Sequence, residues 1–108
     1  MADRRLQVFH AVAKHLSFTK AAEALFMTQP AVTSQIRQLE EHFNTRLFDR
    51  GHGRISLTAA GNVALEYVER ILNVSAELDS RLQEMSGQLG GPLLIGASTT
   101  IADYLLPR

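Results

Sequence analysis

Four side chains within residues 29–37 have types and spacing suited to hydrogen bonding with the base edges of DNA. Gln29 can form paired hydrogen bonds with adenine, and Thr33 offers a hydroxyl group together with a methyl group for thymine. Ser34 and Arg37 can reach bases or phosphates. Because such side chains read the major groove from near the N-terminus of a helix, this chemistry requires a helix that begins close to Gln29.

A second group of residues suits contacts with phosphate and with the minor groove. Ser17 and Thr28 are favourable N-cap residues, and a helix N-terminus is a favourable place for phosphate. Arg50 and Arg54 stand on either side of Gly51-His52-Gly53, whose two glycines accept the positive φ of a tight hairpin loop. Arginine on such a hairpin, or wing, suits a narrow A·T-rich minor groove.

Metal binding and catalysis are not expected. The histidines lack the spacing of metal ligands and the chain has no Cys, so neither a metal nor another cofactor is predicted. Glu40 and Glu41 are neighbours on a helix and point in different directions, which predicts a solvated face with partners such as Arg37. The sequence shows no Ser-His-Asp constellation and no glycine-rich phosphate loop, so we do not expect an enzyme.

Apolar residues at helical spacing predict the elements that must position these side chains. The first helix covers residues 6–16 with Asp3 as its cap, the second follows Ser17, and the third covers residues 28–43. Pro30 lies in the first turn of the third helix, where a missing N–H group costs little. The residues expected to be buried, helix by helix, are Leu6, Phe9, Val12, Ala13 and Leu16; Phe18, Ala21, Ala22 and Leu25; and Val32, Ile36, Leu39 and Phe43.

The pattern changes at residues 46–57, which predict the hairpin of the wing. A hairpin this short is only marginally stable alone, so Phe48 and Leu57 are expected to pack against the helices.

A long helix follows, capped by Thr58, and it carries a heptad seam. At 1.5 Å per residue it would be roughly 45 Å long, and a chain of this size has nothing to cover the seam. A partner chain, most simply a second copy, is therefore expected. The seam positions are Ala64, Val68, Ile71, Ser75, Leu78, Leu82, Met85 and Leu89.

The chain then enters a further segment. Gly90-Gly91-Pro92 ends the long helix, and residues 93–95 predict a buried strand, with Ser98 or Thr99 capping another helix. We therefore expect a DNA-binding domain at 1–57, a linker helix at 58–89, and the hinge and first strand of a truncated domain at 90–108.

Composition indicates a globular protein of the cytoplasm, whereas a net charge of zero, taken alone, argues against nucleic-acid binding. Hydrophobic residues make up 45% of the 108 residues and charged residues 20%, as in globular proteins. No stretch approaches the roughly 18 apolar residues of a membrane span, and the N-terminus is unlike a signal peptide. The net charge is zero, but residues 1–57 carry +3 and residues 58–108 carry −3. Such asymmetry is expected when only one half meets phosphates.

Four blocks of sequence resemble the signature of LysR-type transcription regulators. They are FTKAAEAL at 18–25, TQPAVTSQIRQLE at 28–40, LFDR at 47–50 and LTAAG at 57–61. Their order and spacing match the family over about residues 4–61, residues 58–89 are similar to its linker helix, and residues 91–96 resemble the first strand of its effector domain.

The resemblance implies roles for particular residues. The family reads DNA at the positions of Gln29, Pro30, Thr33, Ser34 and Arg37, and its wing lies at Arg50 and Arg54. Position 34 is often Arg in the family, and Ser34 is shorter. In complete members the positions of Ser98, Thr99 and Thr100 help to bind a small-molecule inducer, which this chain is not expected to bind without the rest of the pocket.

The sequence thus predicts a mainly α fold, a winged helix-turn-helix with a long C-terminal dimerisation helix. As a dimer it would place helix 28–43 in the major groove and hairpin 46–57 beside the minor groove of an interrupted inverted repeat in double-stranded DNA. The resemblance also implies that a complete protein with the effector domain could form a tetramer.

Two alternatives stay open. One is another winged-helix regulator, such as a molybdate-responsive one, although the strand at 91–96 and the Ser/Thr cluster after it favour the LysR type. The other is an interaction module that pairs through residues 58–89 with full-length regulators.

Overall fold

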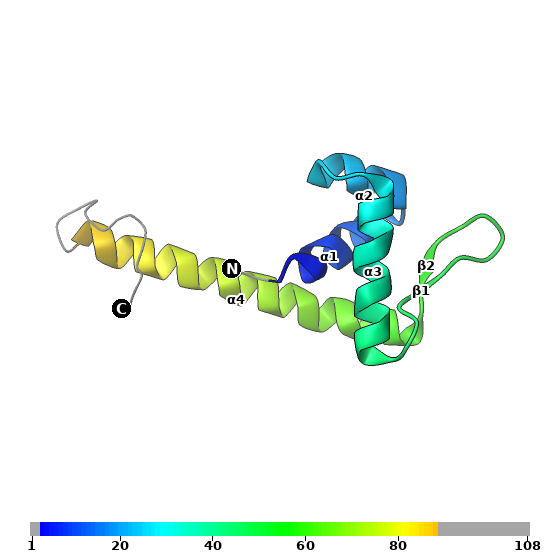
Figure 1. Ribbon diagram of the computed structural model, residues 1–108. Coiled ribbons are helices and arrows are strands. Elements are labelled where there is room, and N and C mark those ends of the chain that lie inside the picture. The colour runs from blue at the N-terminus through cyan, green and yellow to red at the C-terminus, as the bar shows by residue number, and fades with distance from the viewer. Residues whose placement is uncertain (1–2, 89–108) are drawn as a thin grey trace. The chain divides into compact units, whose positions relative to one another are not determined.

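The computed structural model describes residues 3–88, and within this range it has four helices and two strands (Figure 1). The elements are α1 (Arg4–His15), α2 (Phe18–Leu25), α3 (Gln29–Phe43), β1 (Phe48–Asp49), β2 (Ser56–Leu57) and α4 (Ala59–Gln88). The predicted fold class, mainly helical with a small hairpin and a long last helix, is confirmed. The expectations for Leu89 and for residues 90–108 lie outside the described residues.

The predicted caps begin the helices. Ser17 Oγ accepts a hydrogen bond from the Lys20 N–H at 3.0 Å, and Thr28 Oγ1 accepts one from the Ala31 N–H at 3.2 Å. Thr58 Oγ1 accepts one from the Gly61 N–H at 3.0 Å. Each bond satisfies an N–H group that has no partner inside its own helix.

Asp3 caps α1 and pairs with Arg5. Asp3 accepts hydrogen bonds from the Arg5 guanidinium and from the Arg5 N–H. These bonds lower the pKa of the Asp3 carboxyl, the side-chain bond having the larger effect.

The C-caps of α1, α2 and α3 all have left-handed backbone. Leu16, Phe26 and Asn44 have φ of 48°, 57° and 52°. Asn tolerates this conformation, whereas Leu and Phe adopt it at a cost of about 1–2 kcal/mol each. Leu16, expected in the buried stripe of the first helix, is instead 48% exposed because the chain turns at this residue to enter α2.

One apolar core joins α1, α2 and α3 with β1 and the beginning of α4. Phe48 of β1 lies at its centre, with its ring centroid 5.3 Å from that of Phe9 and 6.1 Å from that of Phe18. Leu57 packs against this core, as predicted. The buried residues are Val8, Phe9, Val12, Ala13, Phe18, Ala21, Ala22, Val32, Ile36, Leu39, Leu47, Phe48 and Val68.

Other apolar residues besides Leu16 also lie elsewhere than expected. Phe43, predicted to be buried, is 52% exposed, because α3 ends at this residue and the chain re-enters the core only with Leu47 and Phe48. Val68, predicted to lie in the dimer seam, is buried in the chain's own core. Ala64, also predicted to lie in the seam, packs against the same core.

Within the described residues the chain divides into two units, one that ends at Asn73 and one that begins at Val74. The first unit includes the early turns of α4, where Glu69 Oε2 lies 3.4 Å from His10 Nε2 and 3.5 Å from Lys14 Nζ of α1. These ion pairs lie on the same turns as Val68, so both apolar and polar contacts hold the beginning of α4 in the first unit.

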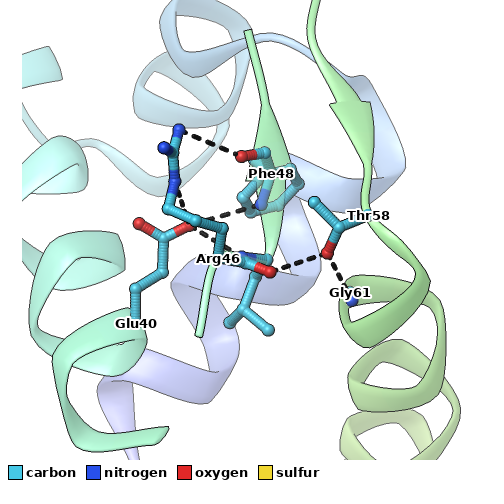
Figure 2. A network of polar contacts seen from close by, with 6 residues as sticks. Glu40, Arg46, Phe48, Thr58 and Gly61 are labelled. Atoms are coloured by element: carbon cyan, nitrogen blue, oxygen red, sulfur yellow. Dashed lines mark hydrogen bonds and ion pairs between the residues drawn. The ribbon is translucent and has the colours of Figure 1, made fainter. Parts of the chain in front are cut away.

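Glu40 holds the beginning of the wing (Figure 2). Its Oε2 accepts hydrogen bonds from the backbone N–H groups of Leu47, at 2.8 Å, and Phe48, at 3.3 Å, and lies 3.9 Å from Arg46 Nε. The expected solvated carboxylate paired with Arg37 is therefore wrong for Glu40, whose side chain is only 19% exposed. The N–H groups of Leu47 and Phe48 do not pair with β2, so the Glu40 carboxylate on α3 accepts their hydrogen bonds instead.

Thr58 continues these contacts to α4. Its hydroxyl donates to the Arg46 carbonyl at 2.7 Å, and its N–H donates to the Leu47 carbonyl at 3.0 Å. A Cβ atom at Gly61 would collide with that same Leu47 oxygen, so only glycine allows so close an approach between α4 and the wing.

We predict that Glu40→Ala lowers the free energy of unfolding by about 1–3 kcal/mol, because two backbone N–H groups lose their acceptor. Urea titration followed by circular dichroism measures this change. Glu41→Ala is the matched control, since Glu41 is exposed and makes no side-chain hydrogen bond or ion pair seen within residues 3–88. Equal effects of the two substitutions would show that the Glu40 carboxylate does not stabilise the wing.

Candidate nucleic-acid interface

The side chains predicted to read DNA gather on one outward face of α3. They line a single open hollow, and Thr33 is half-buried there while the other four are exposed. Gln38 Nε2 donates a hydrogen bond to Ser34 Oγ at 3.4 Å on the same side of the helix. The lining residues are Gln29, Pro30, Thr33, Ser34 and Arg37.

This face begins at the first turn of α3. Thr28 caps the helix, Gln29 is its first residue, and Pro30 follows without an N–H group that would need a partner. The arrangement confirms the predicted local structure and places short polar side chains at the positive end of the helix dipole, where an anion is favoured.

A second open hollow lies between the helices and the wing. Its lining residues come from the end of α1, the beginnings of α2 and α3, and the hairpin loop. They include Ser17, Arg50 and Arg54, which were predicted separately as phosphate or minor-groove contacts. The full set is Leu16, Ser17, Phe18, Thr19, Gln29, Arg50, Gly53, Arg54 and Ile55. No acidic side chain is among these described residues, so the hollow carries the positive charge of two arginines.

Arg50 reaches from the wing to α2. Its guanidinium carbon lies 4.2 Å from the centroid of the Phe18 ring, within the range of a cation–π interaction. Phe18 is itself buried against Phe48, so the position of the Arg50 charge is tied to the aromatic core.

The hairpin turn differs in detail from the expectation. Positive φ falls on His52 (55°) and Gly53 (72°), and Gly51 instead supplies the carbonyl that accepts from the Arg54 N–H at 3.0 Å. Two consecutive positive φ angles with this hydrogen bond are typical of a type I′ turn, whose twist suits a two-stranded hairpin. The ladder pairs Phe48 with Leu57 and Asp49 with Ser56.

Thr19 is a residue of this site that sequence reasoning missed. Its Oγ1 donates a hydrogen bond to Gln29 Oε1 at 3.2 Å, across the turn between α2 and α3. The only signal in the sequence is a hydroxyl residue two positions after a helix cap, and that pattern does not reveal a partner ten residues further on.

The predicted dimerisation residues differ in exposure. In the first unit Ile71 is 47% exposed, unlike Val68. In the second unit Leu78, Leu82 and Met85 are also exposed and Ser75 is half-buried. Large apolar side chains that stay exposed at heptad spacing are typical of a helix that pairs with another.

Residues 3–88 contain neither a metal-binding cluster nor a membrane-spanning helix. No group of three or more His, Cys, Asp or Glu side chains gathers there as metal ligands would. Within the same residues, no helix combines the length and the apolar character needed to cross a membrane.

The sequence was compared with known families and proteins. The family described as "Bacterial regulatory helix-turn-helix protein, lysR family" matches residues 4–62. The "Probable RuBisCO transcriptional regulator" of Porphyra purpurea is 43% identical over 104 residues, which are 96% of this chain and 33% of that protein. The protein of the same name from Cyanidioschyzon merolae is 44% identical over 103 residues, 95% of this chain and 34% of that protein. The chain thus spans about a third of the length of these relatives.

Solved structures resemble the fold. In the "Crystal structure of CbnR_DBD-DNA complex" the similar chain has a TM-score of 0.72 and 36% identity, with 79% of this chain and 98% of that one covered. In the "Crystal Structure of BenM_DBD/catB site 1 DNA Complex" the similar chain has a TM-score of 0.76 and 32% identity, and the match covers 84% of this chain and 99% of that one.

The match over residues 4–62 covers α1, the helix-turn-helix of α2 and α3, the hairpin wing and the first residues of α4. These are the elements that build both hollows. The chain therefore belongs to the LysR family of transcriptional regulators, which are not enzymes, and it carries the helix-turn-helix DNA-binding domain of that family.

Proposed function

We propose that this chain binds double-stranded DNA as a dimer and recognises an interrupted inverted repeat. The observation that carries the proposal is the gathering of the five predicted reading residues on the outward face of α3, beside a hollow with two arginines. Such an arrangement suits α3 in a major groove and the hairpin beside the adjoining minor groove. The CbnR and BenM domains, which resemble this fold, were crystallised with DNA.

The two hollows suggest different tasks. On α3, Gln29 and Thr33 would contact base edges, and Ser34 and Arg37 would contact bases or phosphates. In the second hollow, Arg50 and Arg54 would enter the minor groove. The capped first turns after Ser17 and Thr28 would bind phosphate.

The exposed part of α4 supports dimerisation. Ile71, Leu78, Leu82 and Met85 leave apolar surface in water, and pairing with a second copy would bury it. We propose this seam, with Ser75, in place of the one that began at Ala64 and Val68. Paired long helices would set the distance between the two copies of α3, and hence the separation of the half-sites.

The relatives extend beyond this chain, and we propose that the complete protein adds an effector domain. Ser98, Thr99 and Thr100 would contact a small-molecule inducer there, and this domain would allow tetramers. The domain divisions at 57/58 and 89/90 stay predictions. We also propose a cytoplasmic location, because a regulator must reach its operator.

The proposal is tested by selecting a random pool of duplex DNA with the purified chain at near-physiological salt and sequencing the bound fraction. We expect an enriched, A·T-containing interrupted inverted repeat. Thr33→Ala should weaken binding to that site more than to scrambled DNA, because Thr33 is proposed to contact bases. A folded, dimeric chain that enriches no motif would favour the interaction module instead, and heterodimers with a full-length relative would then be sought.

Arg50→Ala should weaken binding to duplex DNA and reduce the slope of log affinity against log salt by about 1, because the arginine side chain is proposed to release one counterion on contact with DNA. Fluorescence anisotropy over a series of salt concentrations measures the slope. Arg70→Ala is the control, since it removes the same charge from an exposed position of α4 outside both hollows. An unchanged slope for Arg50→Ala would show that Arg50 does not contact DNA.

Leu82→Glu should convert the dimer to a monomer, because it would place two like charges in an apolar seam. Analytical ultracentrifugation measures the mass. Affinity should fall at least about tenfold for a duplex with two half-sites and change little for one half-site, since only the former uses both copies. Ser80→Glu, an exposed position between Leu78 and Leu82 and on the opposite side of the helix, should stay dimeric. A dimeric Leu82→Glu variant would place the dimer contact elsewhere.

A further inference from the structure

The hydroxyl of Thr19 and the carboxamide of Gln29 form a contact that joins the two hollows. Gln29 lines both of them, and Thr19 lines the one beside the wing. The 3.2 Å hydrogen bond runs from Thr19 Oγ1 on α2 to Gln29 Oε1 on α3. We infer that Thr19 is a positioning residue that orients the Gln29 carboxamide for the recognition of adenine. This inference rests on the proposed reading of DNA by Gln29.

The orientation of a carboxamide decides what it recognises. Rotation about its last bond exchanges an acceptor oxygen with a donor NH₂ group, and water satisfies either arrangement. In the structure the Thr19 hydroxyl donates to Gln29 Oε1, which places the oxygen on the side of α2 and leaves both N–H groups of Nε2 available. This bond favours one direction for the Gln29 donors before DNA arrives.

Adenine matches this orientation. In the major groove it presents N7 as an acceptor and the N6 amino group as a donor. A carbonyl oxygen has two lone pairs, so Gln29 Oε1 can accept from Thr19 and from N6 together, while Nε2 donates to N7. Guanine presents acceptors at both N7 and O6, so it would leave Gln29 Oε1 without a donor from the base.

Thr19 is suited to this task because its backbone is held from both sides. It is the second residue of α2, between the buried Phe18 and the Lys20 N–H that Ser17 caps. A threonine side chain has two preferred χ1 rotamers in a helix, so only a small number of positions is open to the hydroxyl. The backbone of Gln29 is also held in place, because Gln29 directly follows the Thr28 cap of α3.

The bond is unsuited to a mainly structural role. Both side chains are exposed, so water can replace the hydrogen bond in the folded chain at little loss of stability. Its loss should therefore appear in the choice of base and not in the midpoint of unfolding. This difference separates a positioning residue from one that only supports the fold.

The test begins by selecting duplexes from a random pool with the wild-type chain and with Gln29→Ala. The base pair at which Gln29→Ala loses preference is the one that Gln29 reads. Competition binding then compares two duplexes that differ only there, A·T against G·C. We expect Thr19→Val to reduce the preference for A·T by about threefold to tenfold, the range of one hydrogen bond, with the unfolding midpoint unchanged. Thr19→Ser keeps the hydroxyl and should retain the preference.

The outcomes distinguish the inference from the proposed function. If Gln29→Ala loses the preference and Thr19→Val keeps it, Gln29 reads DNA without help and the inference is wrong. It is also wrong if Thr19→Ser behaves like Thr19→Val, since the hydroxyl would then not be the cause. If Gln29→Ala changes no base preference, the reading role of Gln29 fails and the inference fails with it. Thr45→Val, an exposed substitution just after α3, is the control for the exchange of Thr for Val.

Discussion

The Glu40 carboxylate joins the two parts of the DNA-binding surface. It accepts hydrogen bonds from the N–H groups of Leu47 and Phe48, so the helix that carries the residues proposed to read DNA also holds the beginning of the wing. Thr58 extends the connection by donating to Arg46 and capping α4. A two-stranded hairpin has little stability of its own. Its position therefore depends on side chains from the helices before and after it.

The apolar core also helps to position the DNA-binding surface. Phe48 enters the core from β1 and contacts the Phe18 ring edge-on, and the Arg50 guanidinium lies over the Phe18 ring. A charge on a loop is thus placed by a cluster of aromatic rings that begins in the core. The wing contributes both the buried phenylalanine and the exposed arginine, so its packing and its charge cannot be changed independently.

Sequence reasoning succeeded where the cause is local. Ser17 and Thr28 bond to N–H groups three residues on, and helical spacing alone places Thr33 and Arg37 on one face. It failed where the cause lies between distant segments. Whether Glu40 meets water or the Leu47 N–H depends on the chain reversal after Asn44, which the pattern of apolar residues does not specify. Val68 shows a second limit: heptad spacing is the same whether the partner is another chain or the chain's own core.

In the proposed complex, affinity and specificity come from different hollows. Among the residues that line the α3 hollow only Arg37 is charged, and Thr33 and Ser34 have short side chains that release no counterions. Most of the charge near phosphate would come from Arg50 and Arg54, which do not distinguish bases directly. Gln29 lines both hollows, so neighbouring groups in either hollow can affect the orientation of its carboxamide. A hydroxyl from α2 that fixes this one carboxamide would therefore affect the choice of base while leaving the charge that attracts DNA unchanged.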